Sequence, residues 1–527
     1  MGKPTLGNTE PRLGASWRSA FLAHSTSPAD VGIWTTSGAP VFTQIPIHMA
    51  LLHTGKVLGF GGSGNDEKRF RKRPHPFEVW DPATNQIQVY RQPLSGDIFC
   101  AGHAFLPDGR LLAAGGTRAY DWVVGRITLK AFGGLHHSYL FDPSTERWTR
   151  GPNLRGGRWH PTLIALGDGR VLAVAGLTKF FPWFFRRKIE VYEPERWSRA
   201  RGASRWMPLY PHLHLLPDGS VFYTGSYNTH YPTVFRLKGF PASRLVEEQV
   251  GDRTRFRWHP ANPVEFFQRE EGASVLLPLR PPDYTPRILV IGGADMGTER
   301  PLPVCRMVEF TDGTERWRDT KPMGHARDCA YASLLPDGHV FVLGGRTGMT
   351  HHGASGVPHL ETESFDPRTE TWTEMAPMTL GREPHSSALL LPDGRVLAAG
   401  GNIGGMRRHE QLQTELFTPP YLHRGPRPRI ENAPTEIAAG RPFAIGSPHA
   451  AAITEVVLIR PTSTTHGFSM DMRFIELPIR GRRAGEVAAE LPERDAMPYL
   501  APPGYYMLFI LADGVPSKSQ FVRVVPL

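Results

Sequence analysis

The chain has 527 residues, of which 40% are hydrophobic and 21% charged, so it can bury a large core. Its net charge of +10 permits contact with acidic partners, but no binding motif accompanies the densest basic run, Lys68–Arg73, and we expect no nucleic-acid partner. Only three cysteines occur, Cys100, Cys305 and Cys329, which excludes a disulfide scaffold.

The N-terminal stretch Met1–Glu10 is polar and has no apolar core of the kind found in secretory signals. No later window is long and apolar enough to span a membrane. We therefore expect a cytoplasmic protein without a membrane partner. We treat residues 1–29 as an N-terminal segment outside the folded domains.

From Ile47 onward, a short apolar strand meets a tight turn, a second apolar strand and a stop of small residues six times. The copies read IHMALLHTGKVLGFGG, CAGHAFLPDGRLLAAGG, HPTLIALGDGRVLAVAG, YPHLHLLPDGSVFYTG, CAYASLLPDGHVFVLGG and HSSALLLPDGRVLAAGG. In the Pro-Asp-Gly turn, proline presets φ, aspartate caps the turn and glycine accepts a positive φ. The pattern predicts a series of β-hairpins.

Two further strand signals follow most hairpins, as in FEVWDPATNQIQVY and ESFDPRTETWTEMAPM. The turn residues Asp108, Asp168 and Asp218 are 60 and 50 positions apart. Four short strands per unit at this period are typical of a kelch-type β-propeller. A seventh unit lies between Glu271 and Met323, where RILVIGG is retained but RPPDYTP replaces the turn.

We therefore expect an all-β chain with two domains. Residues 30–422 form a seven-bladed kelch-type β-propeller, and an outer strand near Trp34–Thr43 closes its ring. After a composition shift at His423–Pro428, residues 423–527 alternate in short strands such as EVVLIRP and YYMLFIL, which predicts a small β-sandwich. We expect the chain to act as a monomer.

One position of the repeat carries chemically active side chains. The residues eight positions before the turn aspartate (Thr54 in the first copy) are Pro46, Cys100, His160, Tyr210, Cys329 and His385. All except the proline can bind a metal or carry an electron. Because the first strand of each propeller blade lines the central channel, these residues form a ring at one level. Imidazole and thiolate donors on such a ring predict a metal site, with copper favoured by affinity order and zinc or iron as alternatives.

The chain also resembles the galactose oxidase and glyoxal oxidase family of copper-radical enzymes from about residue 30 to its end. The resemblance rests on motifs that occur in the family's order, including DIFCAGHAFLPDGRLLAAGG, GGRWHPTLIALGDGRV, PHSSALLLPDGRV, FTPPYLHRGPRPRI and LIRPTSTTHGFSMDMR. It implies a seven-bladed propeller followed by an immunoglobulin-like domain, with copper on the propeller axis.

The resemblance also implies site residues. Cys100 matches the family's cross-linking cysteine, His385 its seventh-blade histidine, and His466 the histidine on a loop of the C-terminal domain. The family's two ligand tyrosines are absent, because His160 and Pro384 take their places. We expect His160, His385 and His466 as metal ligands, with Cys100 and Cys329 as thiolate donors.

Loss of the tyrosines changes the expected chemistry. Oxidation of an alcohol removes two electrons, whereas one copper ion stores only one, and the family keeps the other on its modified tyrosine. We therefore expect a copper-dependent oxidoreductase that uses O₂ or peroxide on a small-molecule or peptide substrate, without a Tyr–Cys radical. Cys100, Tyr210 and Trp159 are the candidate catalytic residues, and a thioether between Cys100 and His160 is a further expectation.

Two other functions stay open at this stage. A kelch propeller with a degenerate site would serve binding or scaffolding, and a metal-dependent enzyme would do non-redox chemistry such as hydrolysis. Cys329, Tyr210 and Trp159 each also have an ordinary interpretation as packed core residues. His103 and His325 are weaker candidates for positions near the site.

Overall fold

The computed structural model describes residues 27–526, except 125–126, 180–183, 229–239, 252, 262–265, 268, 296–297, 299, 312, 348–355, 404–408, 494 and 496. Most of the predicted N-terminal segment, residues 1–26, therefore lies outside the described residues. Within the described part, the chain is almost entirely β-structure, with short helices at α1 (Pro28–Val31) and α2 (Glu67–Arg71) and a 3₁₀ turn at Pro420–His423. No helix among these residues has the length and apolar character needed to cross a membrane.

Each of the first four blades contains four antiparallel strands, and in blades 1 and 2 these four belong to larger sheets. Their strands, from the channel outward, are β2 (His48–Leu51), β3 (Val57–Phe60), β4 (Phe77–Asp81) and β5 (Gln86–Tyr90); β6 (Asp97–Phe105), β7 (Leu111–Val124), β9 (Ser138–Asp142) and β10 (Arg147–Arg150); β11 (Thr162–Ala165), β12 (Val171–Val174), β15 (Glu190–Glu193) and β16 (Arg196–Arg199); and β17 (Leu209–Leu215), β18 (Val221–Asn228), β20 (Ser243–Val250) and β21 (Arg253–Pro260).

Three further blades complete the ring and confirm the predicted seven-bladed propeller. They are β24 (Ala273–Leu276), β25 (Arg287–Ile291), β27 (Cys305–Thr311) and β28 (Thr314–Asp319); β29 (Tyr331–Leu334), β30 (Val340–Leu343), β33 (Thr362–Asp366) and β34 (Thr371–Met375); and β35 (Ser386–Leu390), β36 (Val396–Gly400), β39 (Glu415–Thr418) and β1 (Ile33–Thr35). The unit with the altered turn is blade 5. Strand β1 closes the ring by pairing with β39, with Trp34 opposite Phe417.

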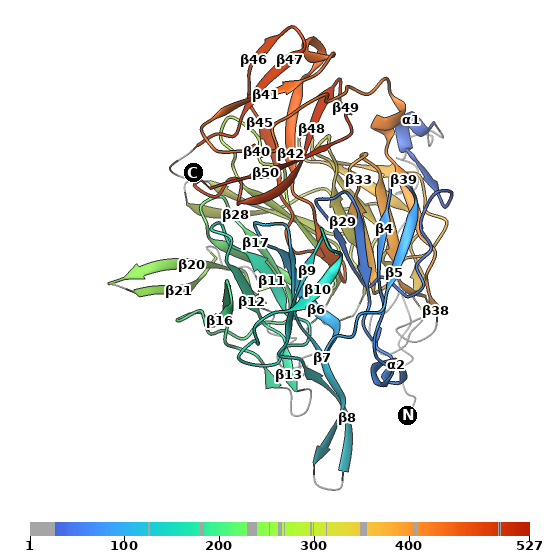
Figure 1. The fold of residues 1–527 in the computed structure, drawn as a ribbon, viewed down its shortest axis with the longest axis vertical. Helices are drawn as coiled ribbons and strands as arrows, with labels where there is room; N and C mark the ends of the chain where they lie inside the picture. Colours follow the sequence, from blue (N-terminus) through green and yellow to red (C-terminus); the bar gives the residue numbers. More distant parts are fainter. Residues whose placement is uncertain are drawn as a thin grey trace, which may run out of the picture.

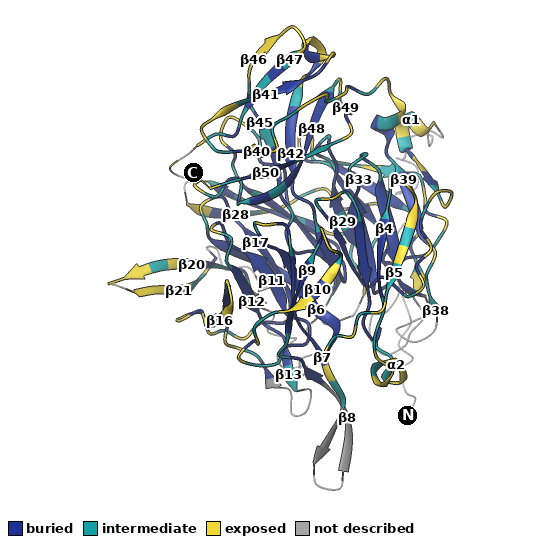
Figure 2. Cartoon of the chain, viewed as in Figure 1, coloured by how far each residue is buried: buried dark blue, intermediate teal, exposed yellow. Residues whose placement is uncertain are grey.

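Apolar clusters join neighbouring blades. Phe77 of blade 1 packs edge-on against Phe141 and Trp148 of blade 2, with ring centroids 5.8 Å and 6.3 Å apart. All residues of inner strands such as β2 and β3 are buried. Outer strands such as β5 and β10 contain exposed residues (Figure 2). Burial of the inner strands gives the channel a rigid wall.

The basic run noted in the sequence lies on and beside helix α2. The carboxylate of Asp66 caps this helix by accepting from the backbone N–H groups of Lys68 and Arg69. Arg69 also pairs with Glu410. The run is thus a surface feature held by acidic neighbours.

The C-terminal domain sits on one end of the propeller and has two sheets (Figure 1). One contains β40 (Glu436–Ile437), β50 (Gln520–Val524), β48 (Gly504–Ala512), β42 (Glu455–Ile459) and β45 (Phe474–Leu477), with β49 (Val515–Pro516) beside β48; the other contains β41 (Pro442–Gly446), β47 (Glu486–Glu490) and β46 (Ile479–Arg483). This arrangement confirms the predicted immunoglobulin-like sandwich.

A hairpin from this sandwich enters the propeller. Strands β43 (Ser463–Thr465) and β44 (Phe468–Ser469) pair with each other, and β43 also pairs with inner strand β2, so that Thr465 lies opposite His48. The sheet of blade 1 therefore extends into the C-terminal domain.

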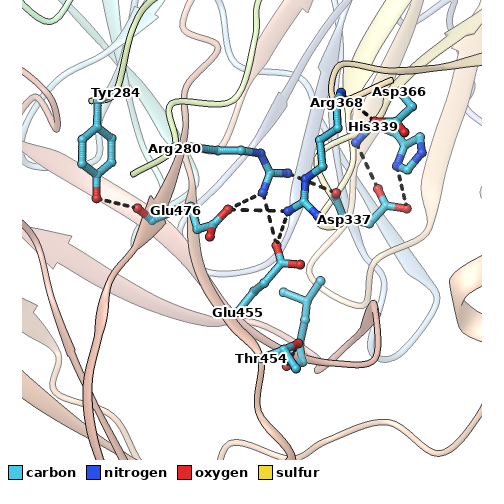
Figure 3. A network of polar contacts seen from close by, with 10 residues as sticks. Arg280, Tyr284, Asp337, His339, Asp366, Arg368, Thr454, Glu455 and Glu476 are labelled. Carbon is cyan, nitrogen blue, oxygen red and sulfur yellow. Dashed lines mark hydrogen bonds and ion pairs between the residues drawn. The ribbon is translucent and has the colours of Figure 1, made fainter. Parts of the chain in front are cut away.

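An ionic network fastens the two domains at the periphery (Figure 3). Arg280 of the propeller contacts Glu476 and Glu455 of the sandwich, the latter at 3.3 Å. Arg368 also reaches Glu455, at 3.3 Å, and Tyr284 donates its hydroxyl hydrogen to the Glu476 carbonyl at 3.0 Å. Charged and neutral hydrogen bonds here come from two separate blades, so they fix orientation as well as contact.

Buried arginine–glutamate pairs brace three blades. In blade 3, Arg158 pairs with Glu190 at 2.9 Å, and neither side chain is exposed to solvent. Arg327 pairs with Glu363 at 2.8 Å in blade 6, and Arg382 lies 3.7 Å from Glu415 in blade 7. Each pair ties the segment before the inner strand to the third strand of the same blade.

Removing one member of such a pair leaves a buried charge without compensation. We expect Glu190→Gln to lower the free energy of unfolding by about 3 kcal/mol. Glu193→Gln, on the same strand but paired at the surface with the exposed Arg196, serves as the matched control and should cost less than about 1 kcal/mol. Urea unfolding of both variants checks this, and equal losses would contradict a bracing role for the buried pair.

Candidate metal centre

Six residues in the first half of an inner strand or just before it share an unusual backbone conformation. All have positive φ, in the left-handed region that residues other than glycine seldom adopt. They are Cys100 (60°), His160 (58°), Tyr210 (44°), Glu271 (59°), Cys329 (50°) and His385 (69°). Five of them occupy the register position found in the sequence. The sixth, Glu271 of blade 5, was missed because its blade lacks the Pro-Asp-Gly turn used for the alignment.

Backbone hydrogen bonds connect this register from blade to blade. The N–H of His160 donates to the Cys100 carbonyl, and the N–H of Tyr210 donates to the His160 carbonyl, both at 3.0 Å. Cys329 and Glu271 make the same bond at 2.6 Å. These bonds hold Cys100, His160 and Tyr210 beside one another, and Glu271 beside Cys329, as expected for equivalent positions of adjoining blades.

His466 reaches this ring from the C-terminal domain. It occupies the tip of the β43–β44 hairpin with Gly467, and their φ values of 50° and 79° are those of a two-residue type I′ turn. The side chain of His466 is buried. Its ring centroid lies 4.7 Å from that of His385 and 5.0 Å from that of His160. Three segments far apart in the sequence thus bring imidazoles together.

Donor atoms converge most closely around Cys100. The ligand atoms of Cys100, His160 and His466 all lie within 4.8 Å of one another. The Cys100 sulfur is 3.8 Å from Nε2 of His466. His385 contributes its ring at the 4.7 Å centroid separation from His466. This buried group, Cys100, His160, His385 and His466, is called the central group below.

Hydrogen bonds orient two of its imidazoles. Nδ1 of His385 bonds Oδ1 of Asn402 at 2.6 Å, and Nδ1 of His466 bonds Oγ1 of Thr465 at 2.6 Å. The amide oxygen of Asn402 accepts only, so Nδ1 of His385 carries its hydrogen and Nε2 keeps a lone pair. Asn402 was not identified from the sequence, since it lies outside the repeat register.

Aromatic rings enclose His160. Its imidazole stacks on Trp159 at 3.8 Å and 15°, and on Tyr210 at 4.6 Å and 27°. The hydroxyl of Tyr210 donates to the Ala101 carbonyl at 2.9 Å. The structure therefore places both aromatic candidates, Trp159 and Tyr210, in direct contact with the central group.

Cys329 lies elsewhere in the ring. Its thiol donates to the Glu271 carboxylate at 3.2 Å, and these two residues form a separate buried cluster with Asp328. The Arg346 guanidinium lies 3.4 Å from Asp328 and 3.8 Å from Glu271 and partly compensates their charge. The structure thus groups Cys329 with carboxylates and does not bring its sulfur into the group of Cys100.

A pair of buried histidines supports Cys100 from behind. The backbone N–H of Cys100 donates to Nε2 of His48 at 3.1 Å, which leaves the His48 hydrogen on Nδ1. Nδ1 of His48 is 3.3 Å from Nε2 of His103. His103 was considered a residue near the site from its sequence position, whereas His48 was not identified.

Burial favours the neutral forms of His385, His466 and Cys100. Desolvation lowers the pKa of His385 to about 4 and the pKa of His466 well below its usual value, so both imidazoles are neutral at pH 7. Burial and the nearby Asp97 raise the pKa of the Cys100 thiol. Neutral imidazoles are the form that binds metals, and a bound cation would favour the thiolate of Cys100.

The fold and the central group define a galactose oxidase-like propeller protein. Residues 74–421 match the family model described as glyoxal oxidase N-terminus, and residues 427–524 match that of the galactose oxidase-like early set domain. The chain belongs to this family.

Relatives support the assignment along most of the chain. The galactose oxidase of Gibberella zeae is 25% identical, over 99% of this chain and 75% of the relative. The aldehyde oxidase GLOX of Vitis pseudoreticulata is 27% identical, over 85% of each chain. A WSC domain-containing protein of Arthroderma benhamiae is 28% identical over 81% of this chain, which spans only 46% of that relative.

A solved structure shares the fold. A fungal alcohol oxidase of the AA5 family, solved in complex with copper, superposes with a TM-score of 0.76 and 22% identity, over 94% of this chain and all of that one. At this identity, the likeness establishes the common architecture.

Buried histidines outside the central group predict acid sensitivity. Desolvation lowers the pKa values of His103, His212 and His214 to about 3, against about 6.5 in an unfolded chain. Below pH 6.5 the unfolded state therefore binds more protons, and the free energy of unfolding falls by about 1.4 kcal/mol per histidine at pH 5.5. Asp328, whose pKa burial raises to about 6, offsets part of this loss. Urea unfolding of metal-free protein at pH 7.5 and 5.5 measures the difference, and equal stability at both would contradict it.

The His466 hairpin leaves no room beside its second turn residue. A Cβ at Gly467 would lie 2.8 Å from the Ala330 carbonyl oxygen, whereas a Cβ at Gly485, with nearly the same φ (78° against 79°), would meet nothing within 4 Å. Gly467→Ala should therefore displace the hairpin and lower both thermal stability and metal affinity.

Gly485→Ala serves as its matched control, because it carries the cost of the positive φ without the collision. Differential scanning calorimetry and metal titration of the two variants measure these effects. Equal losses in both would show that the hairpin tip tolerates displacement.

Proposed function

We propose that this protein is a copper-dependent oxidoreductase with a mononuclear, histidine-rich centre formed by His160, His385 and His466, with Cys100 as a further donor. The observation that carries the proposal is the convergence of the buried Cys100, His160 and His466 donor atoms within 4.8 Å of one another, with the ring centroid of His385 4.7 Å from that of His466. Convergence of several donors on one point is what a metal site requires.

The donor chemistry fits copper. Imidazole nitrogen suits divalent copper, which binds more tightly than other first-row divalent ions in the affinity order, and a cysteine sulfur favours the cuprous state. The stacked Trp159 and Tyr210 and the backbone bonds of the ring hold His160 in place without competing for metal. The same set would also accept zinc, which is why the test below uses a signal specific to copper.

The proposed centre differs from the family pattern at the residue that stores the second electron and at one further ligand. Copper would supply one-electron chemistry with O₂ or peroxide as the oxidant. Position 160 carries histidine, and position 384 carries proline, where the pattern has tyrosine. Two of the oxidisable groups beside the centre are the Cys100 thiol and the Tyr210 phenol. Burial raises the pKa of Tyr210 well above its usual value, so that the phenol holds its proton. We propose one of these, or an external reductant, as the source of the second electron for a small-molecule or peptide substrate.

Copper loading tests the ligand set. Metal-free protein given one equivalent of Cu²⁺ should show an EPR spectrum with nitrogen hyperfine coupling. Because each imidazole contributes a nitrogen, His160→Ala and His385→Ala should each change this coupling and lower copper affinity about tenfold or more. His423→Ala, at an exposed histidine, is the control and should leave the spectrum unchanged.

Two outcomes would redirect the proposal. Failure of the wild-type chain to retain copper would favour a binding or scaffold protein. Retention without turnover of O₂ or peroxide in the presence of a reductant would favour non-redox metal chemistry. Peptide mass spectrometry adds a separate readout, because a Cys100–His160 thioether would join two peptides with the loss of two hydrogen atoms to an oxidant such as O₂.

A further inference from the structure

Blades 3, 6 and 7 share a frame that makes their positions directly comparable. The braced arginine donates to the backbone carbonyl two residues before its partner glutamate in all three blades: Arg158 to Lys188, Arg327 to Glu361, and Arg382 to Gln413. In each blade, the residue two positions before that carbonyl donates its backbone N–H to a glycine carbonyl. The pairs are Arg186 to Gly176, His359 to Gly345, and Gln411 to Gly401. These contacts establish the equivalence without a sequence alignment.

The side chains at the equivalent positions differ in kind. Blade 6 has His359 and Glu361, with His325 two residues before its arginine. The other two blades have Gly156, Arg186 and Lys188 in blade 3, and Leu380, Gln411 and Gln413 in blade 7. Blades 3 and 7 thus make the same backbone hydrogen bonds without histidine or glutamate at these positions. Packing of the blade therefore does not require the two histidines and the glutamate found in blade 6.

The three side chains of blade 6 have metal-site geometry. The ligand atoms of His325, His359 and Glu361 all lie within 4.8 Å of one another. Nε2 of His359 donates to the Ala326 carbonyl at 2.9 Å, which leaves the Nδ1 lone pair facing Oε2 of Glu361 at 3.1 Å. Two acceptors at this distance need a cation between them. Donors that share a tetrahedral zinc ion lie about 3.3 Å apart, given bonds of about 2.0–2.1 Å.

The surroundings of His359 suit a metal ion. His359 is buried, and its imidazole is held between the segment before β29 and the segment that enters β33. The Ala326 carbonyl fixes its tautomer, as backbone carbonyls do for metal-binding histidines. The Glu361 side chain is 40% exposed, which leaves the open side of the cluster to water.

We propose that His325, His359 and Glu361 form a second metal site, separate from the central group, that binds Zn²⁺. Two imidazole nitrogens and one carboxylate oxygen would supply three ligands, and water would complete the tetrahedron. The ion would join the segment before β29 to the segment that enters β33, both in blade 6. The site requires no redox chemistry and does not depend on the proposed copper centre.

Zinc and cobalt titrations of the metal-free full chain test the site. In a His160→Ala/His385→Ala background, which impairs the central group, calorimetry should still detect one equivalent of Zn²⁺. Co²⁺ should give the intense visible absorption of a tetrahedral ion. Adding His325→Ala or Glu361→Gln should weaken this binding about tenfold or more and abolish the Co²⁺ band, whereas adding His423→Ala should change neither.

The wild-type chain provides a second comparison that does not depend on the double variant folding. There, Glu361→Gln should reduce the zinc content by one equivalent without changing the copper EPR spectrum. Absence of a zinc equivalent in the double variant, or unchanged zinc affinity in both Glu361→Gln and His325→Ala, would overturn the proposal. A plain His359–Glu361 ion pair would instead show a change of the His359 pKa by NMR in Glu361→Gln, with zinc binding unaffected.

Discussion

The centre of this protein depends on the left-handed backbone at the start of six inner strands. A left-handed residue other than glycine costs roughly 1–2 kcal/mol, so six of them persist only because the surrounding structure imposes the conformation. The bonds from His160 to Cys100, from Tyr210 to His160 and from Cys329 to Glu271 contribute to this by tying blades 3, 4 and 6 to the blade before each. In an ordinary strand, successive side chains point alternately to the two faces of the sheet. The left-handed conformation turns the chain at these residues and so directs their side chains toward the propeller axis.

The ring alone does not complete the centre, because one imidazole arrives from the other domain. His466 reaches the axis only while β43 stays paired with β2, and that pairing continues the sheet of blade 1. A shared apolar core, in which Phe341 of the propeller and Phe509 of the sandwich take part, also joins the domains, and Arg280 contacts Glu476 across them. Domain docking and assembly of the central group are therefore one structural event, and a change at the domain interface reaches His466 through the hairpin.

The repeat pattern was sufficient to predict the seven blades, the closing strand and the ring, because turn chemistry and strand spacing are local properties that recur. It identified Cys100, His160, Tyr210 and His385 for the same reason. The repeat pattern does not predict contacts between blades. Glu271 lies in the blade whose turn departs from the pattern, and its carboxylate accepts a hydrogen bond from Cys329. From the repeat position alone, Cys329 and Cys100 are equally good candidate ligands. Asn402 and His48 act by reaching across to His385 and Cys100, and such pairings depend on which blades adjoin.

Comparison of blades 3, 6 and 7 distinguishes the interactions that the fold requires from the side chains that form a site. The buried pairs of Arg158, Arg327 and Arg382 with their glutamates recur, and the carbonyls they engage are the same in each blade. Because backbone carbonyls accept these bonds, the side chains at the same residues are free to vary, and lysine, glutamate and glutamine occupy that position in blades 3, 6 and 7. Backbone hydrogen bonds also connect residues of the left-handed ring, although Cys100, Tyr210 and Glu271 carry a thiol, a phenol and a carboxylate. A propeller held by its main chain in this way can exchange the side chains at its axis without losing the geometry that brings them together.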